Sequence, residues 1–452
     1  MKVCKFGGSS LADAARIAQV CDIVAADADR RIVVVSAPGK RESSDIKVTD
    51  LLLACAEARL TGGDVAGAVA RVVERYAAIQ RELGLDAAVM TRIAAQLEAV
   101  VGGPIDDRAR YLDAVKAAGE DNNARLVAEA LSSRGVPARY TDPREAGLLL
   151  SPEYGRARVL PESYENLARL ADAEDRVVFP GFFGYTREGQ VVTFSRGGSD
   201  ITGSILAAAV HAELYENFTD VDAVLSADPT IVPDAAPIAE LTYREMRELA
   251  YAGFGVLHDE AIVPAVQAMI PICIRNTQKP EAPGTLIVTR HAVDTTRVVG
   301  IASSAGFCSI YVSKYLMNRE VGFGRKLMQI LEEENLSYEH MPSGIDNISV
   351  VLEEAAFTSE RAAHVLRRIR DELEANDVSV ERGLALIMIV GEGMRFTVGL
   401  AATATRALAD AGVNIEMMNQ GSSEISMMFG VKAEYRERAV NSLYKAFFEE
   451  SV

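Results

Sequence analysis

Short apolar runs alternate with helical periodicity along the first 290 or so residues of the 452-residue chain. A β-prone run from Met1 to Phe6 is followed by glycines, by a helix-like pattern over 11–26 and by the continuous apolar run RIVVVS at 31–36. Apolar positions three and four residues apart indicate a helix, whereas a short uninterrupted apolar run indicates a buried strand. The opening therefore predicts a βαβ unit of a parallel sheet.

The same alternation continues towards residue 290. Residues 47–133 have largely helical spacing, interrupted by glycines at 62–63 and by Gly-Gly-Pro at 102–104. Further strands are expected at 176–179, 190–194, 212–217 and 271–275, with helices at 200–211 and 242–251. Strands that alternate this regularly with helices predict an α/β sandwich.

From residue 298 onward two segments share one plan, which is a strand, a glycine turn, a helix and further strands. In the first segment the strands are expected at 308–313, 336–340 and 348–353 and the helix at 325–335. In the second the strands are expected at 384–390, 413–418 and 425–431 and the helix at 399–411. This internal duplication of a small βαββ-type unit predicts paired regulatory or assembly modules.

Composition and charge exclude several classes of protein. The chain has 47 basic and 64 acidic residues and a formal charge of −17, which argues against a nucleic-acid or anionic-membrane partner. Any anionic ligand must therefore be bound by cationic side chains close to it. Five scattered cysteines suggest neither a disulfide framework nor a zinc site. With no apolar run of about 18 residues, we expect a cytoplasmic protein.

The first glycine loop, Lys5-Phe6-Gly7-Gly8-Ser9, lies between the first strand and the first helix. Glycines let backbone N–H groups approach a phosphate, the helix N-terminus adds partial positive charge, and the lysine supplies a mobile cation. A simple tight turn is the alternative. Neither a Walker A pattern nor GxGxxG is present, so P-loop and dinucleotide enzymes lose support.

A second glycine loop runs from Arg196 to Asp200, with the sequence RGGSD, and leads into a helix. The guanidinium of Arg196 could bind a carboxylate bidentately, and the carboxylate of Asp200 could hold a lysine or a substrate ammonium. A capped helix is the alternative. The turn at 219–222 is either a nucleotide contact or a solvated loop.

Together these segments resemble the aspartate kinases of the amino-acid kinase superfamily. The matching text is KFGGSS at 5–10, VVVSAPG at 33–39, KVTDLL at 47–52, GE at 119–120, RGGSD at 196–200, TDVDAVLSADP at 219–229, LTYREMRELAYAG at 241–253 and VLH at 256–258. The resemblance implies a three-layer αβα sandwich with a mainly parallel sheet as the catalytic domain over 1–292. Two ferredoxin-like (βαββαβ) ACT domains would follow over 298–375 and 376–452, and the strand near 298–304 would interleave with the second.

The resemblance implies transfer of the ATP γ-phosphoryl group to the β-carboxylate of L-aspartate, which gives 4-phospho-L-aspartate and ADP. This is the first step of lysine, threonine and methionine (diaminopimelate) biosynthesis. A carboxylate with a pKa of about 3.9 is already ionised at neutral pH, so no catalytic His or Cys is needed as a general base. Mg²⁺ is expected to arrive with the ATP phosphates and without side-chain ligands.

The same resemblance gives each motif a role. The catalytic residues are Lys5, the cation on the transferring phosphoryl group, and Asp200, which orients Lys5 and the substrate. Arg196 would bind the α-carboxylate of aspartate and Glu120 its ammonium. The remaining residues of the aspartate pocket would be Ser36, Thr49, Gly197, Gly198 and Ser199. The ATP site would comprise Lys5, Phe6, Gly7, Gly8, Ser9, Thr219, Asp220, Leu225 and Thr230.

Three positions depart from the commonest family pattern. Leu225, Thr230 and Gly255 stand where many members have Tyr, Arg and Lys at the nucleotide. We therefore expect different adenosine contacts in this chain.

The ACT pair resembles the amino-acid sensor of feedback-inhibited aspartate kinases, with lysine as the leading effector and threonine as the second. The candidate effector pocket comprises Met317, Glu320, Gly322, Phe323, Ser337, Tyr338 and Glu339, with Asn414 and Ile415 from the second unit. Glu339 would supply a carboxylate for the effector ammonium. Such modules bind effectors at the seam between two chains, which implies at least a homodimer. The alternative is that Phe323 and Tyr338 are ACT core.

Two other functions compete with this interpretation. One is a different amino-acid kinase, acting on glutamate, acetylglutamate or UMP, but the RGGSD loop, Glu120 and the tandem ACT units argue against it. The other is a non-catalytic amino-acid-sensing subunit, which only the three departures at the nucleotide site suggest.

Overall fold

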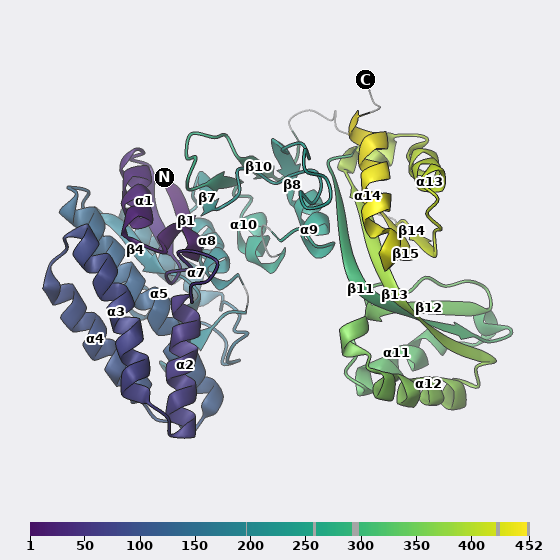
Figure 1. Cartoon of the computed structure of the whole chain (residues 1–452), viewed down its shortest axis with the longest axis horizontal. Coiled ribbons are helices and arrows are strands. Elements are labelled where there is room, and N and C mark those ends of the chain that lie inside the picture. The colour runs from purple at the N-terminus through teal and green to yellow at the C-terminus, as the bar shows by residue number, and fades with distance from the viewer. Residues whose placement is uncertain (196, 256–258, 292–297, 422–424, 450–452) are drawn as a thin grey trace. The chain divides into compact units, whose positions relative to one another are not determined.

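The predicted βαβ opening is present in the computed structural model, which describes residues 1–195, 197–255, 259–291, 298–421 and 425–449. Strand β1 (Lys2–Phe6) continues through a short 3-10 helix (Gly8–Leu11) into helix α1 (Ala14–Ala25), and strand β2 (Arg30–Val35) follows (Figure 1). The two strands pair in parallel, as expected.

Contacts among Cα atoms divide the chain into two units. The first comprises residues 1–224, 237–246 and 255–292, and the second comprises residues 225–236, 247–254 and 293–452. The segments 225–236 and 247–254 thus cluster with the C-terminal part of the chain. The expected domains over 1–292, 298–375 and 376–452 stay predictions.

The first unit is built on an eight-stranded sheet with the order β3-β4-β2-β1-β7-β9-β10-β8. Its other strands are β3 (Ala138–Tyr140), β4 (Arg176–Pro180), β7 (Leu214–Thr219), β8 (Glu240–Thr242), β9 (Ile272–Asn276) and β10 (Thr285–Val288). All neighbouring strands pair in parallel except β9 and β10, which are antiparallel. The mainly parallel sheet is therefore confirmed.

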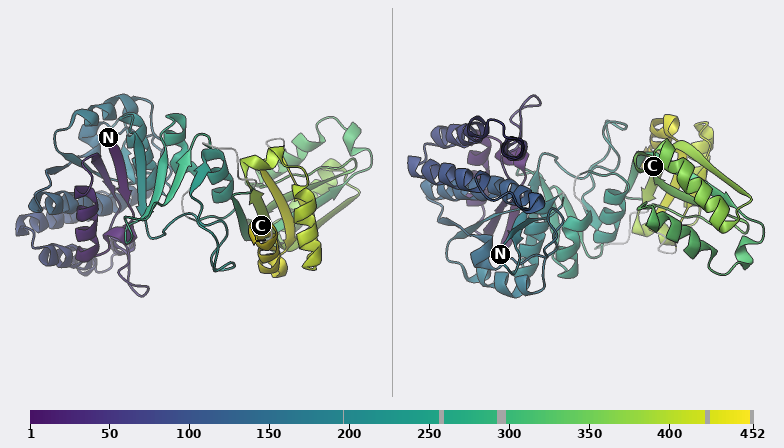
Figure 2. Two further views of the ribbon diagram at one scale, coloured as in Figure 1. Left: turned by 90° about the horizontal axis from the view of Figure 1, so that it is seen from above. Right: turned by 90° about the horizontal axis from the view of Figure 1, so that it is seen from below.

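The stretch over 47–133 is helical, as predicted, and forms α2 (Val48–Thr61), α3 (Val65–Leu83), α4 (Ala87–Val101) and α5 (Arg108–Ser133). Side chains of Asp64, Asp86 and Asp107 cap the N-termini of α3, α4 and α5. Gly62 and Gly84, at φ of 73° and 69°, end α2 and α3 in the left-handed conformation that glycine adopts without strain. Figures 1 and 2 show these four helices packed beside one another.

Helices cover both faces of this sheet. The apolar side chains of α1 to α5 form one core with Phe6, Val33 and Phe218 of the strands. On the other face α8 (Gly198–Ala209) packs on β1 and β7 and contacts α7 (Glu162–Ala168) and α10 (Val263–Gln267). The helices α6 (Pro143–Ala146) and α9 (Tyr243–Tyr251) complete the set in the first 291 residues that the structure describes.

One further expected strand is confirmed and another is wrong. The strand expected at 190–194 is present as β6 (Val191–Thr193), which pairs with β5 (Phe183–Tyr185) in a two-stranded ribbon separate from the main sheet. Residues 336–340 form no strand, because their ladder is reduced to one bridge between His340 and Val351. An alternating pattern alone does not identify the partner that a strand needs.

The second unit is built on a five-stranded antiparallel sheet with the order β12-β11-β13-β15-β14. The strands are β11 (Gly300–Ser313), β12 (Asn347–Glu353), β13 (Asp377–Val390), β14 (Met417–Asn419) and β15 (Ser426–Lys432). The helices are α11 (Phe323–Glu333), α12 (Ser359–Leu373), α13 (Leu400–Asp410) and α14 (Arg436–Tyr444). The antiparallel sheet that ACT domains imply is therefore present.

Two cores divide this second sheet. The long strands β11 and β13 pair along their whole length, from Gly300 with Val390 to Ser313 with Asp377. Ile301, at the start of β11, packs in the core with α13 and α14, whereas Ile310 packs in the core with α11 and α12. One strand thus contributes to both modules.

Strand β7 of the first unit carries a buried ion cluster on the face covered by α1. The carboxylate of Glu216, with no exposed surface, accepts hydrogen bonds from Arg30 Nε at 2.6 Å, Arg30 Nη2 at 2.9 Å and Arg275 Nη1 at 2.8 Å. Burial raises the pKa of Glu216, but the two guanidinium groups outweigh it, so the pKa lies below its ordinary value. This cluster ties β7 to β2 and β9.

We expect Glu216→Gln to lower the free energy of unfolding by about 3 kcal/mol, because two guanidinium groups lose the charge that compensates their burial. The matched control is Glu213→Gln, whose carboxylate is mostly exposed and binds the N-terminal ammonium, and which should cost less than about 1 kcal/mol. Urea unfolding followed by circular dichroism measures both. Equal losses in the two variants would contradict a structural role for the cluster.

Candidate active site

Three polar side chains meet in the first unit. Lys5 in β1 stands directly opposite Asn217 in β7, because the two strands pair in parallel in that register. Asp200, in the first turn of α8, places Oδ1 2.5 Å from Lys5 Nζ. The side chains of Lys5 and Asp200 are only 9% and 15% exposed, so the ion pair is largely shielded from water. The two predicted catalytic residues are therefore in contact.

Asn217 is a site residue that the sequence analysis missed. Its Nδ2 donates to Asp200 Oδ1 at 2.9 Å, and its Oδ1 accepts from Lys5 Nζ at 3.3 Å. The available signal was the polar pair Glu216-Asn217 between the aromatic residues Tyr215 and Phe218 of β7, and all four residues are buried. Opposite faces of β7 thus carry two separate polar clusters, since successive side chains alternate.

The glycine loop after β1 is shaped by a close approach of two backbones. A Cβ at Gly8 would lie 2.9 Å from the carbonyl oxygen of Ala37, and the N–H of Gly39 donates to the Gly8 carbonyl at 2.8 Å. Gly8 therefore has a steric reason to be glycine. A Cβ at Gly7 would lie 3.6 Å from Lys5 Nζ, so its absence leaves the ammonium uncovered on that side.

Glu120 of α5 lies beside the same loop. Its carboxylate accepts a hydrogen bond from the Ala37 backbone N–H, and among the described residues its Oε2 has no partner. Burial raises the pKa of Glu120 to about 7, against small opposing effects of Lys47 and Lys116. A buried carboxyl oxygen without a donor suits a ligand that brings its own hydrogen-bond donor.

Two other predicted aspartate-pocket residues adjoin this loop. Asn123 Nδ2 donates to the carbonyl of Ser36 at 2.7 Å, which ties the end of β2 to α5. Thr49 is half-buried in the first turn of α2, where the neighbouring Val48 N–H donates to the carbonyl of Pro38 at 3.0 Å. The structure thus places Ser36, Thr49 and Glu120 around residues 36–38.

The RGGSD loop is described from Gly197 onward, and Arg196 lies outside the described residues. Gly197 has φ of 72° and precedes α8, which begins at Gly198. A Cβ at Gly198 would lie 2.6 Å from Cδ2 of Phe182, so the side chain of Phe182 requires glycine there. Ser199 is 8% exposed and lies in the first turn of α8, next to Asp200.

A cavity of about 320 Å³ brings together two predicted ATP segments, since Ser9 lines it together with Thr219 and Asp220. Its other side chains, which were not predicted from the sequence, come from Ser10, Arg16, Gln19, Lys40, Glu42, Ser43, Thr277 and Gln278. The Arg16 guanidinium donates to the carbonyls of Ser9 at 3.1 Å and Lys40 at 3.0 Å and so holds the walls together. Hydroxyl, amide and carboxylate oxygens dominate, a set compatible with phosphates and a hydrated Mg²⁺.

Leu225 and Thr230 belong to the second unit. Leu225 packs against the core of α13 and α14, and Thr230 is exposed and donates its hydroxyl to Asp228. Gly255 is exposed in the first unit. Nucleotide contacts of Leu225 and Thr230 stay predictions.

Across the described part of the chain, no group of three His, Cys, Asp or Glu side chains is arranged to hold a metal ion. Among the same residues, no helix has the length and apolarity to cross a bilayer.

The candidate effector residues divide between core and surface. Met317 and Phe323 are 8% and 4% exposed and belong to the core of α11 and α12, whereas Tyr338 is 49% exposed. Gly322, at φ of 85°, precedes α11, and Ser337 is exposed. The core interpretation thus holds for Phe323 but not for Tyr338.

The two carboxylates of this set already have partners. Glu320 Oε2 lies 2.6 Å from Lys314 Nζ and its Oε1 2.8 Å from Lys326 Nζ, and these lysines lower the pKa of Glu320. Glu339 accepts a hydrogen bond from the hydroxyl of Tyr251. Burial raises the pKa of that hydroxyl, and the Glu339 charge adds to the effect.

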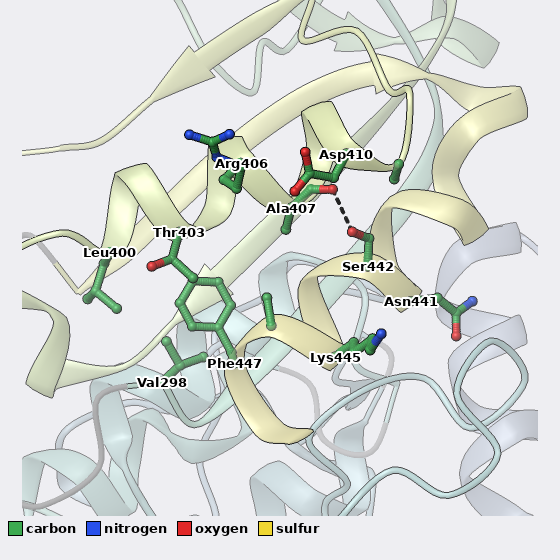
Figure 3. A pocket seen from close by; sticks show the side chains of 12 residues that line it. Val298, Leu400, Thr403, Arg406, Ala407, Asp410, Asn441, Ser442, Lys445 and Phe447 are labelled. Atoms are coloured by element: carbon green, nitrogen blue, oxygen red, sulfur yellow. Dashed lines mark hydrogen bonds between the residues drawn. The ribbon is translucent and has the colours of Figure 1, made fainter. Parts of the chain in front are cut away.

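In the second module Asn414 Nδ2 donates to Glu416 at 3.0 Å, and Ile415 packs on the core. A hollow of about 860 Å³ between α13 and α14 lies apart from these candidate effector residues (Figure 3). Arg406 and Asp410 line it from α13, and Lys445 and Phe447 line it from the residues that follow α14. None of the candidate effector residues lines this hollow.

A parallel-sheet domain with a lysine cation beside a glycine loop, joined to an antiparallel ACT-type sheet, defines an amino-acid kinase with a regulatory part. Family models agree: the amino acid kinase family model matches residues 1–276 and an ACT domain model matches residues 387–447. The chain is 55% identical over 448 residues to "Aspartokinase 3" of Bacillus subtilis (strain 168), with 99% of both chains covered. The chain belongs to the aspartokinases of the amino acid kinase family, which confirms the resemblance drawn from its motifs.

Solved structures show the same relationship. An aspartate kinase of Clostridium acetobutylicum matches with a TM-score of 0.87 and 38% identity, covering 99% of this chain and 100% of that one. Aspartokinase III of E. coli in complex with aspartate and ADP matches with a TM-score of 0.79 and 26% identity, with the same coverage. The chain is also 29% identical to "Lysine-sensitive aspartokinase 3" of Escherichia coli (strain K12), with 99% of both chains covered.

Proposed function

We propose that this chain transfers the γ-phosphoryl group of ATP to the β-carboxylate of L-aspartate and releases 4-phospho-L-aspartate and ADP. The observation that carries the proposal is the Lys5 ammonium, which is largely shielded from water, is bound by Asp200 and has no side chain beside it at Gly7. Relatives support the substrates, since the E. coli structure holds aspartate and ADP.

The chemistry needs charge stabilisation more than proton transfer. The attacking carboxylate is ionised at neutral pH, and the obstacle is its repulsion from the phosphoryl oxygens. The Lys5 ammonium would neutralise charge on the transferring group, and the low exposure of the pair strengthens that interaction. The N-terminus of α8 adds partial positive charge next to Asp200.

Binding of aspartate is assigned to the groups around residues 36–38 and the RGGSD loop. Glu120 would hold the substrate ammonium with its unpartnered oxygen, Arg196 the α-carboxylate, and Ser36, Thr49 and Ser199 the remaining polar atoms. The cavity lined by Ser9, Thr219 and Asp220 would take phosphates. Mg²⁺, when bound with ATP, would supply further positive charge on the phosphate oxygens.

The proposal includes assembly and regulation. The chain would form a cytoplasmic homodimer, or a larger oligomer, through its ACT modules. This oligomer would catalyse the first step of the pathway to lysine, threonine and methionine, and lysine would inhibit it. The lysine-sensitive E. coli relative supports this effector, and Glu339 offers a carboxylate for its ammonium. The E. coli structure in complex with lysine and aspartate, with a TM-score of 0.73, also supports it.

The decisive experiment measures acyl-phosphate formation from L-aspartate with ATP and Mg²⁺, trapped as the hydroxamate, with L-glutamate as the comparison substrate. We expect turnover with aspartate and none above background with glutamate. Lys5→Ala should abolish turnover, because the charge on the transferring phosphoryl loses its cation. Lysine binding, measured by calorimetry, should persist in that variant, and turnover like that of the wild type would refute the role of Lys5.

Aspartate binding should depend on pH through Glu120. Its pKa of about 7 means that the carboxylate, which an ammonium ligand requires, is lost as the pH falls below that value. KM for aspartate should therefore rise about tenfold from pH 8 to pH 6, with KM for ATP nearly constant. Glu120→Gln should raise KM at pH 8 and remove its pH dependence. A KM for aspartate that is flat over this range in the wild type would contradict the assignment.

Lysine and Tyr251 should compete for Glu339. Tyr251→Phe removes the hydroxyl donor and should lower the lysine concentration for half-inhibition by about three- to tenfold, whereas Glu339→Gln should raise it. Tyr435→Phe, in the second module, is the matched control and should leave the value unchanged. Inhibition curves with lysine, and with threonine in parallel, measure the effect. Identical curves for wild type and both Glu339 and Tyr251 variants would place the effector elsewhere.

A further inference from the structure

The side chain of Asn217 bridges the two charged groups of the active site. It is 2% exposed, its Nδ2 lies 2.9 Å from Asp200 Oδ1, and its Oδ1 lies 3.3 Å from Lys5 Nζ. Asp200 Oδ1 also accepts from Lys5 at 2.5 Å, so one carboxylate oxygen is shared by both donors. The three side chains form a closed triangle of hydrogen bonds.

The chemistry of its partners fixes the orientation of this amide. A lysine ammonium only donates hydrogen bonds, and an ionised carboxylate only accepts them. The carbonyl oxygen of Asn217 must therefore face Lys5 and its amino group must face Asp200, and a flipped amide would lose both bonds. A neutral group that both donates and accepts is required at this position.

The bridge is not needed to attach α8 to the sheet. The hydroxyl of Tyr215, also on β7, donates to the backbone carbonyl of Asp200 at 3.1 Å. The same tyrosine ring packs where Gly203 has no side chain, since a Cβ there would lie 2.5 Å from its hydroxyl. The backbone of α8 is thus held by Tyr215, while Asn217 acts only on the two charged side chains.

We propose that Asn217 is a positioning residue for phosphoryl transfer, which holds the Lys5 ammonium and the Asp200 carboxylate in their catalytic geometry without adding charge. The proposal rests on the proposed function. A displacement of about 1 Å at such a group is enough to slow a reaction by up to about a hundredfold. A neutral bridge also leaves the ammonium balanced by one carboxylate instead of two, so more of its charge acts on the phosphoryl group.

The first test is Asn217→Leu in the full-length enzyme. We expect kcat to fall by about 10- to 100-fold, with KM for ATP and for aspartate within about threefold of wild type, because the lost interaction acts in the transition state. Asn122→Leu is the matched control. Asn122 of α5 is as deeply buried as Asn217, and it donates to the side chain of Gln96 on α4 and to the carbonyl of Ala118 on α5. Its thermal midpoint should fall similarly and its kcat should not change.

Asn217→Asp gives a readout that a structural role would not produce. The introduced carboxyl can donate to Asp200 only when protonated, and two adjacent carboxyls hold a proton to higher pH than one does. Its kcat relative to wild type should therefore rise as the pH falls from 8 to 6, whereas that of Asn217→Leu should stay flat. In an Asp200→Asn background, Asn217→Leu should have little further effect.

Three results would overturn the proposal: a kcat within twofold of wild type for Asn217→Leu, an equal loss of kcat in Asn122→Leu, or a loss confined to KM. The wild-type hydroxamate assay separately tests the proposed function. A crystal structure of the Asn217→Leu variant does not depend on catalytic activity. It therefore tests the positioning role even if the wild-type protein shows no turnover with aspartate. Lys5 Nζ or the Asp200 carboxylate should move by about 1 Å or more, and unchanged positions would refute the proposal.

Discussion

The parallel register of β1 with β7 is the constraint on which the active site depends. Pairing Lys5 with Asn217 puts both side chains on the face covered by α8, where Asp200 begins its helix. The same register stacks Phe6 on Phe218 on the opposite face, with ring centroids 4.8 Å apart. A slip of one residue would exchange the two faces and bury the ammonium in an apolar core, so packing of the core and assembly of the site are one event.

The buried charged side chains of the first unit fall into two groups, those that are fully engaged by protein partners and those that are not. The Glu216 carboxylate has two guanidinium partners that fully engage it, and it serves the fold. Glu120 is nearly as deeply buried but keeps an oxygen without a partner among the described residues, and Lys5 keeps one side uncovered at Gly7. Burying an unsatisfied polar group costs stability, which the fold tolerates where a ligand completes the interaction.

Local signals predicted more of this molecule than long-range ones. The βαβ opening, the helices over 47–133 and the glycine loops followed from periodicity and from residues such as Gly62, whose conformation is local. Lys5 and Asp200 came from the family motifs. Asn217 was missed because its role depends on a partner 212 residues away in the sequence, through a strand register that no local pattern encodes. The pairing partner of strand β6 was not predicted for the same reason, nor was the way in which two similar segments form one sheet through the shared strands β11 and β13.

Helix α9 is where the proposed catalysis and regulation meet along the chain. Its first turn belongs to the first unit, where Glu245 binds His291, whose two ring nitrogens lie 3.0 Å from Glu240 and 2.8 Å from Glu245. Its last residue, Tyr251, belongs to the second unit and donates to Glu339. If lysine binds Glu339 as proposed, the side chain that it displaces, Tyr251, lies fewer than two helical turns along the chain from the cluster of Glu240, Glu245 and His291.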